Sequence, residues 1–173
     1  MSTFKVLLFL GLLTISVNAW SKISVHPICF QARGDQPGYF QHYGANKLVK
    51  GLRLKWLSGE VRCESKVMYS SKWGCYQHAG FKGYRLNVIV TDSNNNIIFP
   101  KPQYIKHTAG LWYWLPGVDE RHSNELVFTD FATPFYLVQG GILKIWYGED
   151  LKNWNEGNNQ GQVCVDIYAL FAD

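Results

Sequence analysis

The residues with the clearest chemical potential lie in a polar loop near the end of the chain. This loop contains eight oxygen-bearing side chains, namely Glu149, Asp150, Asn153, Asn155, Glu156, Asn158, Asn159 and Gln160. Calcium takes roughly six to eight oxygen ligands and accepts carboxylates and amides in flexible geometry. The spacing is not that of an EF-hand, because Lys152 stands where a second acidic or amide ligand would fall. A simple polar hairpin loop is the alternative, since Asn, Asp and Gly dominate turns for conformational reasons.

The order of these residues resembles the calcium-binding loop of the bacterial galactophilic lectins of PA-IL type. The likeness lies in Asp150, the adjacent pair Asn158 and Asn159, and the alternating strand that follows Gly161. The resemblance implies a calcium ion held by four side chains, Asp150, Asn155, Asn158 and Asn159, and bridging two hydroxyls of galactose. Asn155 stands where that family has threonine, and Asp150 aligns only after a one-residue shift. The likeness is close only in the C-terminal third, and the family's main-chain ligand from an early loop has no counterpart that can be placed.

Three further residues are candidate sugar contacts. Trp154 lies inside the polar loop, where its ring could stack on the apolar face of galactose. Gln77 and His78 lie in the loop 70–80, which corresponds loosely to a sugar-contacting loop of the lectin family. A lone histidine is more often structural, and most other aromatic residues, including those at 112–114, suit the core of a small β protein.

The elements that must position these residues are short strands. Residues 143–146 lead into the polar loop, and residues 163–171 follow it with a period of two. One face of this last strand is apolar, with Val163, Val165, Ile167, Ala169 and Phe171. Further strands are predicted at 24–31, 47–57, 60–69, 84–90, 97–99, 103–107, 111–115, 126–128 and 135–138. With no sustained helical period, the pattern predicts an all-β, single-domain antiparallel β-sandwich, and the resemblance implies a jelly-roll or galactose-binding-like form.

The first 19 residues predict a secretory signal peptide. They contain Lys5, an apolar run over 6–15 and a small-residue cleavage site that ends at Ala19. Cleavage there leaves one domain over 20–173 without a membrane-spanning segment. Loss of Lys5 leaves 16 basic and 13 acidic residues, and the resulting charge of +3 is too mild and scattered to indicate nucleic-acid binding.

All four cysteines lie beyond the predicted signal peptide. In an oxidising compartment an even number favours two disulfides, although three pairings are open. We favour Cys63–Cys75, which closes a short local loop, and Cys29–Cys164, which ties the first strand to the last. A zinc site is the alternative, but no CxxC pair or histidine cluster accompanies the cysteines.

Other functions find less support in the residues. The chain has no G-x-S-x-G elbow, H-E-x-x-H or P-loop, and Glu149 and Asp150 would point to opposite faces if they lay on a strand, so no enzyme is predicted. Arg33-Gly34-Asp35 matches the tripeptide that integrins recognise, but such a short sequence recurs by chance. The preferred interpretation is a secreted, extracellular, calcium-dependent lectin for galactose-containing glycans. The alternative is a structural or adhesive extracellular matrix protein, mineral-associated and without sugar binding.

Overall fold

The computed structural model describes residues 19–172, so the predicted signal peptide, apart from Ala19, lies outside the described residues. The strands are β1 (Ser21–Lys22), β2 (Ile28–Gln31), β3 (Gly38–Gln41), β4 (Lys47–Arg62), β5 (Val88–Thr91), β6 (Ile97–Phe99), β7 (Ile105–His107), β8 (Trp112–Tyr113), β9 (Glu125–Thr129), β10 (Phe135–Leu137), β11 (Ile142–Tyr147) and β12 (Gln160–Phe171). The helical turns are η1 (Val67–Tyr69), η2 (Ala79–Phe81), η3 (Pro102–Tyr104), α1 (Gly148–Leu151) and η4 (Glu156–Asn158). The predicted all-β class is confirmed.

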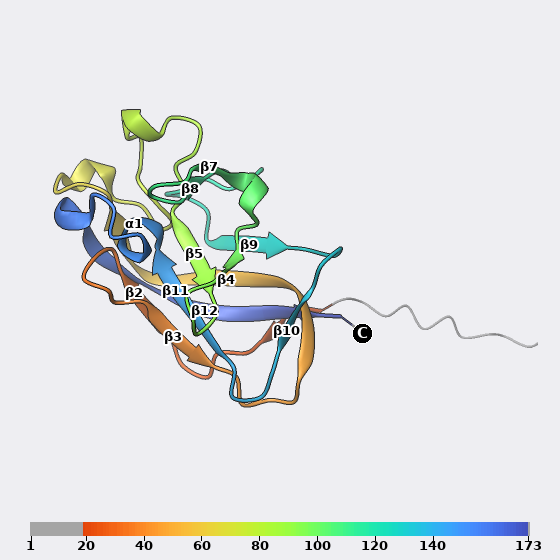
Figure 1. Ribbon diagram of the computed structural model, residues 1–173. Helices are drawn as coiled ribbons and strands as arrows, with labels where there is room; N and C mark the ends of the chain where they lie inside the picture. Colours follow the sequence, from red (N-terminus) through yellow and green to blue (C-terminus); the bar gives the residue numbers. More distant parts are fainter. Residues whose placement is uncertain (1–18, 173) are drawn as a thin grey trace, which may run out of the picture.

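Two antiparallel sheets enclose the core (Figure 1). The larger sheet has the order β1-β12-β4-β10, with β2 also paired to β12 and β9 to β4. The smaller sheet has the order β3-β11-β5-β6, and β7 and β8 form a separate pair. No described helix is long and apolar enough to cross a bilayer.

The strands β4 and β12 pair along most of their length and form the centre of the larger sheet. The predicted alternation in β12 is confirmed, because Val163, Val165, Ile167 and Ala169 are fully buried. β4 is one strand of 16 residues, whereas the sequence predicted two strands separated near Gly59. Gly59 adopts a φ of 82°, and an added Cβ there would lie 2.1 Å from the Gln162 carbonyl oxygen, so this glycine permits close strand pairing instead of ending the strand.

Both favoured disulfides are present. Cys29 in β2 lies opposite Cys164 in β12, and the bond between them joins the beginning of the sandwich to its last strand. Cys63 and Cys75 are bonded across a separation of 12 residues. The described residues contain no free cysteine.

Candidate functional site

The polar loop between β11 and β12 is folded into two helical turns, α1 and η4. Figure 1 shows α1 at the same end of the sandwich as the connection between β2 and β3. Glu149 and Asp150 both lie in α1 and are buried, at 1% and 0% exposure. They therefore do not point to opposite faces of a strand, and both carboxylates are enclosed at the end of the sandwich.

The Asp150 carboxylate is held by the loop between β2 and β3. Its Oδ1 atom accepts a hydrogen bond from the Asp35 main-chain N–H at 2.8 Å, and its Oδ2 atom accepts one from Gln36 at 3.2 Å. Next to it, the Gly34 N–H donates to Glu156 Oε2 at 3.1 Å. Main-chain N–H groups from one loop thus support two carboxylates of another.

The Arg-Gly-Asp tripeptide closes over the outside of the polar loop. Its Arg33 guanidinium donates to the Gly157 carbonyl oxygen at 2.8 Å, while the three side-chain positions remain exposed. The tripeptide therefore has a structural role beside the candidate site. These contacts do not test integrin recognition, which the sequence already disfavoured.

The Glu149 carboxylate has one satisfied oxygen and one unsatisfied oxygen. Its Oε1 atom accepts a hydrogen bond from the buried Trp112 indole at 3.0 Å, whereas Oε2 is buried and has no partner. The Glu149 main-chain N–H donates to Asn87 Oδ1 at 3.1 Å, and Asn87 is itself buried and donates to the Gly110 carbonyl oxygen. Asn87 and Trp112 therefore fix Glu149 from the core side.

Asn159 provides the second unsatisfied oxygen. Its side-chain N–H donates to the Ala32 carbonyl oxygen at 3.2 Å, and its Oδ1 atom is buried without a partner. The Asn159 amide lies within hydrogen-bonding reach of the Glu149 carboxylate. Buried polar atoms in native proteins are nearly always paired, so two unpaired oxygens on neighbouring side chains indicate a missing partner.

Both buried carboxyl groups have raised pKa values. Burial raises the pKa of Glu149 from 4.5 to about 7, although the nearby Asn159 amide and the Trp112 hydrogen bond oppose the shift. Burial and then the hydrogen bond with Glu156 raise the pKa of Asp150 from 3.8 to about 7, against the two main-chain N–H groups. Among residues 19–172, no positively charged group contributes to either pKa, so neither carboxylate has a cationic partner that would stabilise its charge.

These residues suit an oxygen-preferring cation. A cation beside Glu149 Oε2 and Asn159 Oδ1 would supply the missing partner and stabilise the charged carboxylates. Within residues 19–172, no three His, Cys, Asp or Glu side chains are grouped closely enough to form a metal site by themselves. Such an ion would also need amide or main-chain oxygens. Of the other predicted ligands, Asn155 adopts a φ of 55° before η4, and Asn158 ends η4; both are exposed.

Trp154 is packed more closely than its polar neighbours in the sequence suggested. Its ring lies against Gly110, where an added Cβ would be only 2.6 Å away, and 4.8 Å from the His107 ring. The side chain is half-buried, with the rest of its surface available at the edge of the polar loop. Packing against Gly110 and His107 therefore holds this ring, and its sugar contact stays a prediction.

The other two predicted sugar contacts, His78 and Gln77, have different hydrogen-bond partners. His78 accepts a hydrogen bond from the Gly80 N–H, contacts Glu64 at 3.1 Å, and packs 4.9 Å from the Phe81 ring. Phe81 in turn stacks on Trp112, which connects His78 to the site through packed rings. These contacts give His78 a structural role.

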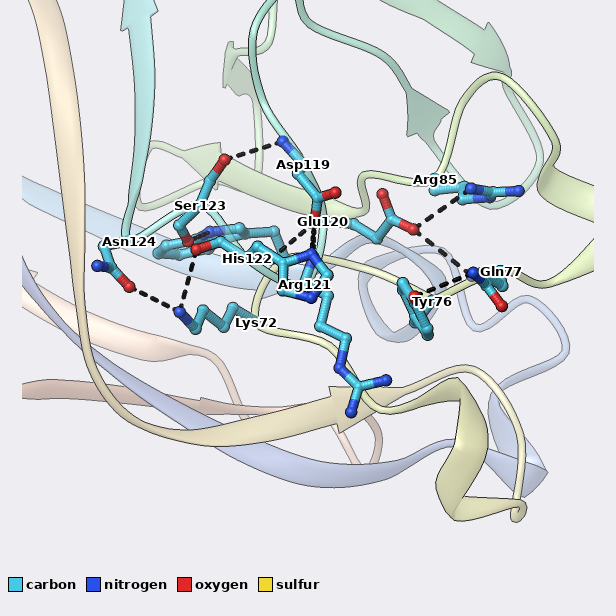
Figure 2. A network of polar contacts seen from close by, with 11 residues as sticks. Lys72, Tyr76, Gln77, Arg85, Asp119, Glu120, Arg121, His122, Ser123 and Asn124 are labelled. Atoms are coloured by element: carbon cyan, nitrogen blue, oxygen red, sulfur yellow. Dashed lines mark hydrogen bonds and ion pairs between the residues drawn. The ribbon is translucent and has the colours of Figure 1, made fainter.

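Gln77 belongs to a different polar network, shown in Figure 2. Its main-chain N–H points to Glu120 Oε1 at 3.5 Å, and its side chain donates to the Tyr76 hydroxyl. The residue itself is exposed. The structure therefore gives no contact between Gln77 and the polar loop, and Gln77 and His78 do not act as one pair.

Comparison with known proteins identifies the relationship. No protein-family model and no curated protein matches the chain. Among solved structures, AJLec from the sea anemone Anthopleura japonica matches with a TM-score of 0.81 and 35% sequence identity, over 90% of this chain and 98% of AJLec. The chain belongs to the family of this sea-anemone lectin. Membership in the AJLec family supports the predicted lectin-like fold, and AJLec itself is a lectin, a class of binding proteins and not of enzymes.

Sequence reasoning missed the residues that support the site from elsewhere in the AJLec-like fold. Asn87, Trp112 and the N–H groups of Asp35 and Gln36 lie far from the polar loop in sequence. One signal was available for Asn87, a polar residue in a run of apolar residues. The N–H groups of a Gly-containing loop offered no comparable signal.

Proposed function

We propose that the protein is a secreted lectin that binds galactose-containing glycans through a calcium ion held by the polar loop. The relationship to AJLec supports carbohydrate binding. The observation that carries the calcium part is the pair of buried, unpaired oxygens, Glu149 Oε2 and Asn159 Oδ1, beside Asp150. Calcium is the preferred ion because these donors are carboxylate and amide oxygens.

The ion would link the protein to the sugar. Asp150 and Asn159 are the buried members of the predicted ligand set, and the exposed Asn155 and Asn158 lie on the solvent side of the loop. Glu149 joins them as a further oxygen donor. Calcium accepts up to about eight oxygens, so positions left open toward solvent would take two sugar hydroxyls. Trp154, half-buried at the edge, is positioned to contact the apolar face of the ring.

We also propose that residues 1–19 are a signal peptide and that residues 20–173 act as a single secreted domain. The two disulfides are consistent with this, because such bonds persist in oxidising compartments. A short signal for secretion and a covalently stabilised sandwich fit a lectin that works outside the cell. Amino-terminal sequencing of secreted protein checks the cleavage site.

The test of calcium-bridged recognition is retention on galactose-agarose with and without chelator. Asp150→Asn keeps the size of the side chain but removes the charge, so we expect retention to fall at least about tenfold, as for loss of a charged ligand. Asp92→Asn is the matched control. Asp92 also accepts two main-chain N–H groups, from Asn94 at 2.8 Å and Asn96 at 2.9 Å, but it lies in the exposed turn between β5 and β6.

Wild type and Asp92→Asn should be retained in calcium and released by chelator. Retention of wild type that chelator leaves unchanged would falsify the role of calcium. Wild type that is never retained, in calcium or without it, would favour the matrix-protein alternative. An Asp150→Asn variant that behaves as wild type would remove Asp150 from the site.

A further inference from the structure

A surface pocket that includes Trp114 and Arg85 involves none of the proposed calcium ligands. It has a volume of about 370 Å³, and the lining residues used here are Arg85, Leu86, Trp114, Val118, Asp119 and Glu120. Figure 2 shows Arg85 and Glu120 facing one another. The pocket combines an aromatic ring, a small apolar floor and a few charged groups, the composition of a small-molecule site.

Trp114 is the aromatic wall of the pocket. Its neighbours Trp112 and Tyr113 are fully buried, whereas Trp114 is 47% exposed. The main chain at this point is fixed, because Tyr113 and Leu86 exchange hydrogen bonds at 3.0 and 3.1 Å. The exposed ring is therefore held in place by a rigid backbone. The electron-rich face of an indole suits the weakly positive C–H groups of a sugar ring.

Arg85 and Glu120 provide polar groups that are not fully used. The Arg85 guanidinium lies 3.6 Å from Glu120 Oε1, and the Arg85 side chain is 31% exposed, so part of it is open to a ligand. Figure 2 draws contacts from only one of the two Glu120 carboxylate oxygens, those to Arg85 and to the Gln77 N–H. A carboxylate acceptor next to a guanidinium donor can bind two neighbouring hydroxyls of one ligand.

The network behind these groups makes the pair rigid. The Lys72 and Trp73 N–H groups both donate to the Glu120 carbonyl oxygen at 3.0 Å. Cys75 donates its N–H to the Arg85 carbonyl oxygen at 3.1 Å, and Cys75 is in a disulfide. The main chains of both residues are thus fixed before any ligand arrives, which reduces the entropy lost on binding.

We infer that this pocket, hereafter the Trp114 pocket, is a second carbohydrate site that binds a neutral hexopyranoside without a metal ion. The apolar face of the sugar stacks on Trp114, and two adjacent hydroxyls bind Glu120 and Arg85. A single chain would then present two sugar sites of different chemistry and could cross-link glycans. The site is independent of the proposed calcium site, since it shares no residue with it.

The experiment uses full-length secreted protein labelled with 5-fluorotryptophan, with a chelator present throughout. The chain has seven tryptophans, and the Trp114 fluorine signal is assigned by its absence in Trp114→Phe. Methyl glycosides of galactose, glucose and mannose are added up to about 100 mM, which detects millimolar affinity. We expect at least one glycoside to shift the Trp114 signal in a saturable manner, with the Trp154 signal unchanged.

Three variants make the result specific. Glu120→Gln keeps the shape of the side chain and should weaken binding about tenfold, as expected for loss of a charge-assisted hydrogen bond. Asp150→Asn, in the calcium site, should leave the shift unchanged. Tyr136→Ala removes an aromatic ring that is 60% exposed on another strand and should also have no effect.

The inference is overturned if no glycoside shifts the Trp114 signal in chelator, or if the shift appears only when calcium is restored. It is also overturned if Glu120→Gln binds as well as wild type. None of these outcomes decides the calcium proposal, which is tested by chelator-sensitive retention. Conversely, a loss of calcium binding in Asp150→Asn leaves the Trp114 pocket unaffected.

Discussion

Two loops that follow strands each contain an aspartate whose carboxylate accepts main-chain hydrogen bonds, but only one of the two carboxylates has a cationic partner among the described residues. Asp130 follows β9, and its carboxylate accepts hydrogen bonds from the Thr133 hydroxyl, the Thr133 N–H and the Ala132 N–H, and pairs with Lys101 at 2.9 Å. Hydrogen bonds from Thr133 and Lys101 hold its pKa well below the usual range. Asp150 follows β11 and also accepts two main-chain N–H groups, but it has no cationic partner and its pKa is raised to about 7.

The difference separates a structural loop from the loop that we propose binds calcium. The Asp130 loop is complete, because a lysine supplies the positive charge that its carboxylate needs. The polar loop contains Glu149, Asp150 and Glu156 close together, with two buried oxygens unpaired. An arrangement that is costly for the empty protein is reasonable if a cation normally completes it.

The largest expected difference between the two loops is in how far an Asp→Asn substitution lowers the free energy of unfolding in chelator. Asp130→Asn removes the partner of Lys101 and weakens several charge-assisted hydrogen bonds, so it should lower the free energy of unfolding by about 2 kcal/mol. Asp150→Asn removes a charge that the empty site stabilises poorly, so its loss should be under about 1 kcal/mol. Urea unfolding in chelator measures both. Equal losses would remove the distinction between the loops.

Packing behind the polar loop gives a smaller effect. An added Cβ at Gly110 would lie 2.6 Å from the Trp154 ring and 2.9 Å from Trp112 Nε1, so Gly110→Ala should cost about 1–2 kcal/mol by forcing the rings to move. Gly157→Ala is the control in the same loop, because no atom lies within 4 Å of its Cβ position. Thermal unfolding compares the two. A Gly110→Ala variant as stable as Gly157→Ala would show that Trp154 is not packed as described.

The pH dependence of the free energy of unfolding should differ in sign between the two loops. The raised pKa values of Glu149 and Asp150 mean that the folded protein holds their protons more tightly than the unfolded chain. The stabilisation of the folded state by these two protonated groups is fully present below about pH 4 and is lost as the pH rises through about 7. The lowered pKa of Asp130 gives a contribution that is present above about pH 4 and lost as the pH falls further.

Unfolding measured in chelator from pH 3 to pH 9 tests this directly. In Asp150→Asn, the free energy of unfolding should fall less between about pH 4 and 7 than in wild type. In Asp130→Asn, it should fall less below about pH 4. Added calcium should stabilise the protein more at pH 8 than at pH 5, because it binds the charged carboxylates. A calcium effect that is equal at both pH values would contradict the assignment of these groups.

Local pattern in the sequence predicted the larger elements and the covalent bonds. The period of two in β12 and the even number of cysteines each reflect one physical constraint, and both predictions are confirmed. β3 was missed because its four residues lie in a Gly- and Pro-containing segment that is typical of a loop. β4 was predicted as two strands because a glycine in the sequence is equally compatible with a strand end and with a tight strand pair, and the positive φ of Gly59 belongs to the second case.

The candidate site was only partly predictable for a related reason. Asp150 and Asn159 were selected from donor type and spacing, which are local properties. Their supporting contacts come from residues more than 100 positions away, such as the Asp35 N–H and the Ala32 carbonyl oxygen. Whether a carboxylate is paired with a lysine, as at Asp130, or left without one, as at Asp150, depends on the tertiary fold.

The most direct measurement is a calorimetric titration of chelator-stripped protein with calcium at pH 8. We predict saturable binding with a dissociation constant on the order of 10⁻⁴–10⁻³ M, as for extracellular calcium sites of low charge. The binding should be lost or at least about tenfold weaker in Asp150→Asn and unchanged in Asp130→Asn. No saturable binding at millimolar calcium, or equal binding by wild type and Asp150→Asn, would contradict the claim that the polar loop is a calcium site.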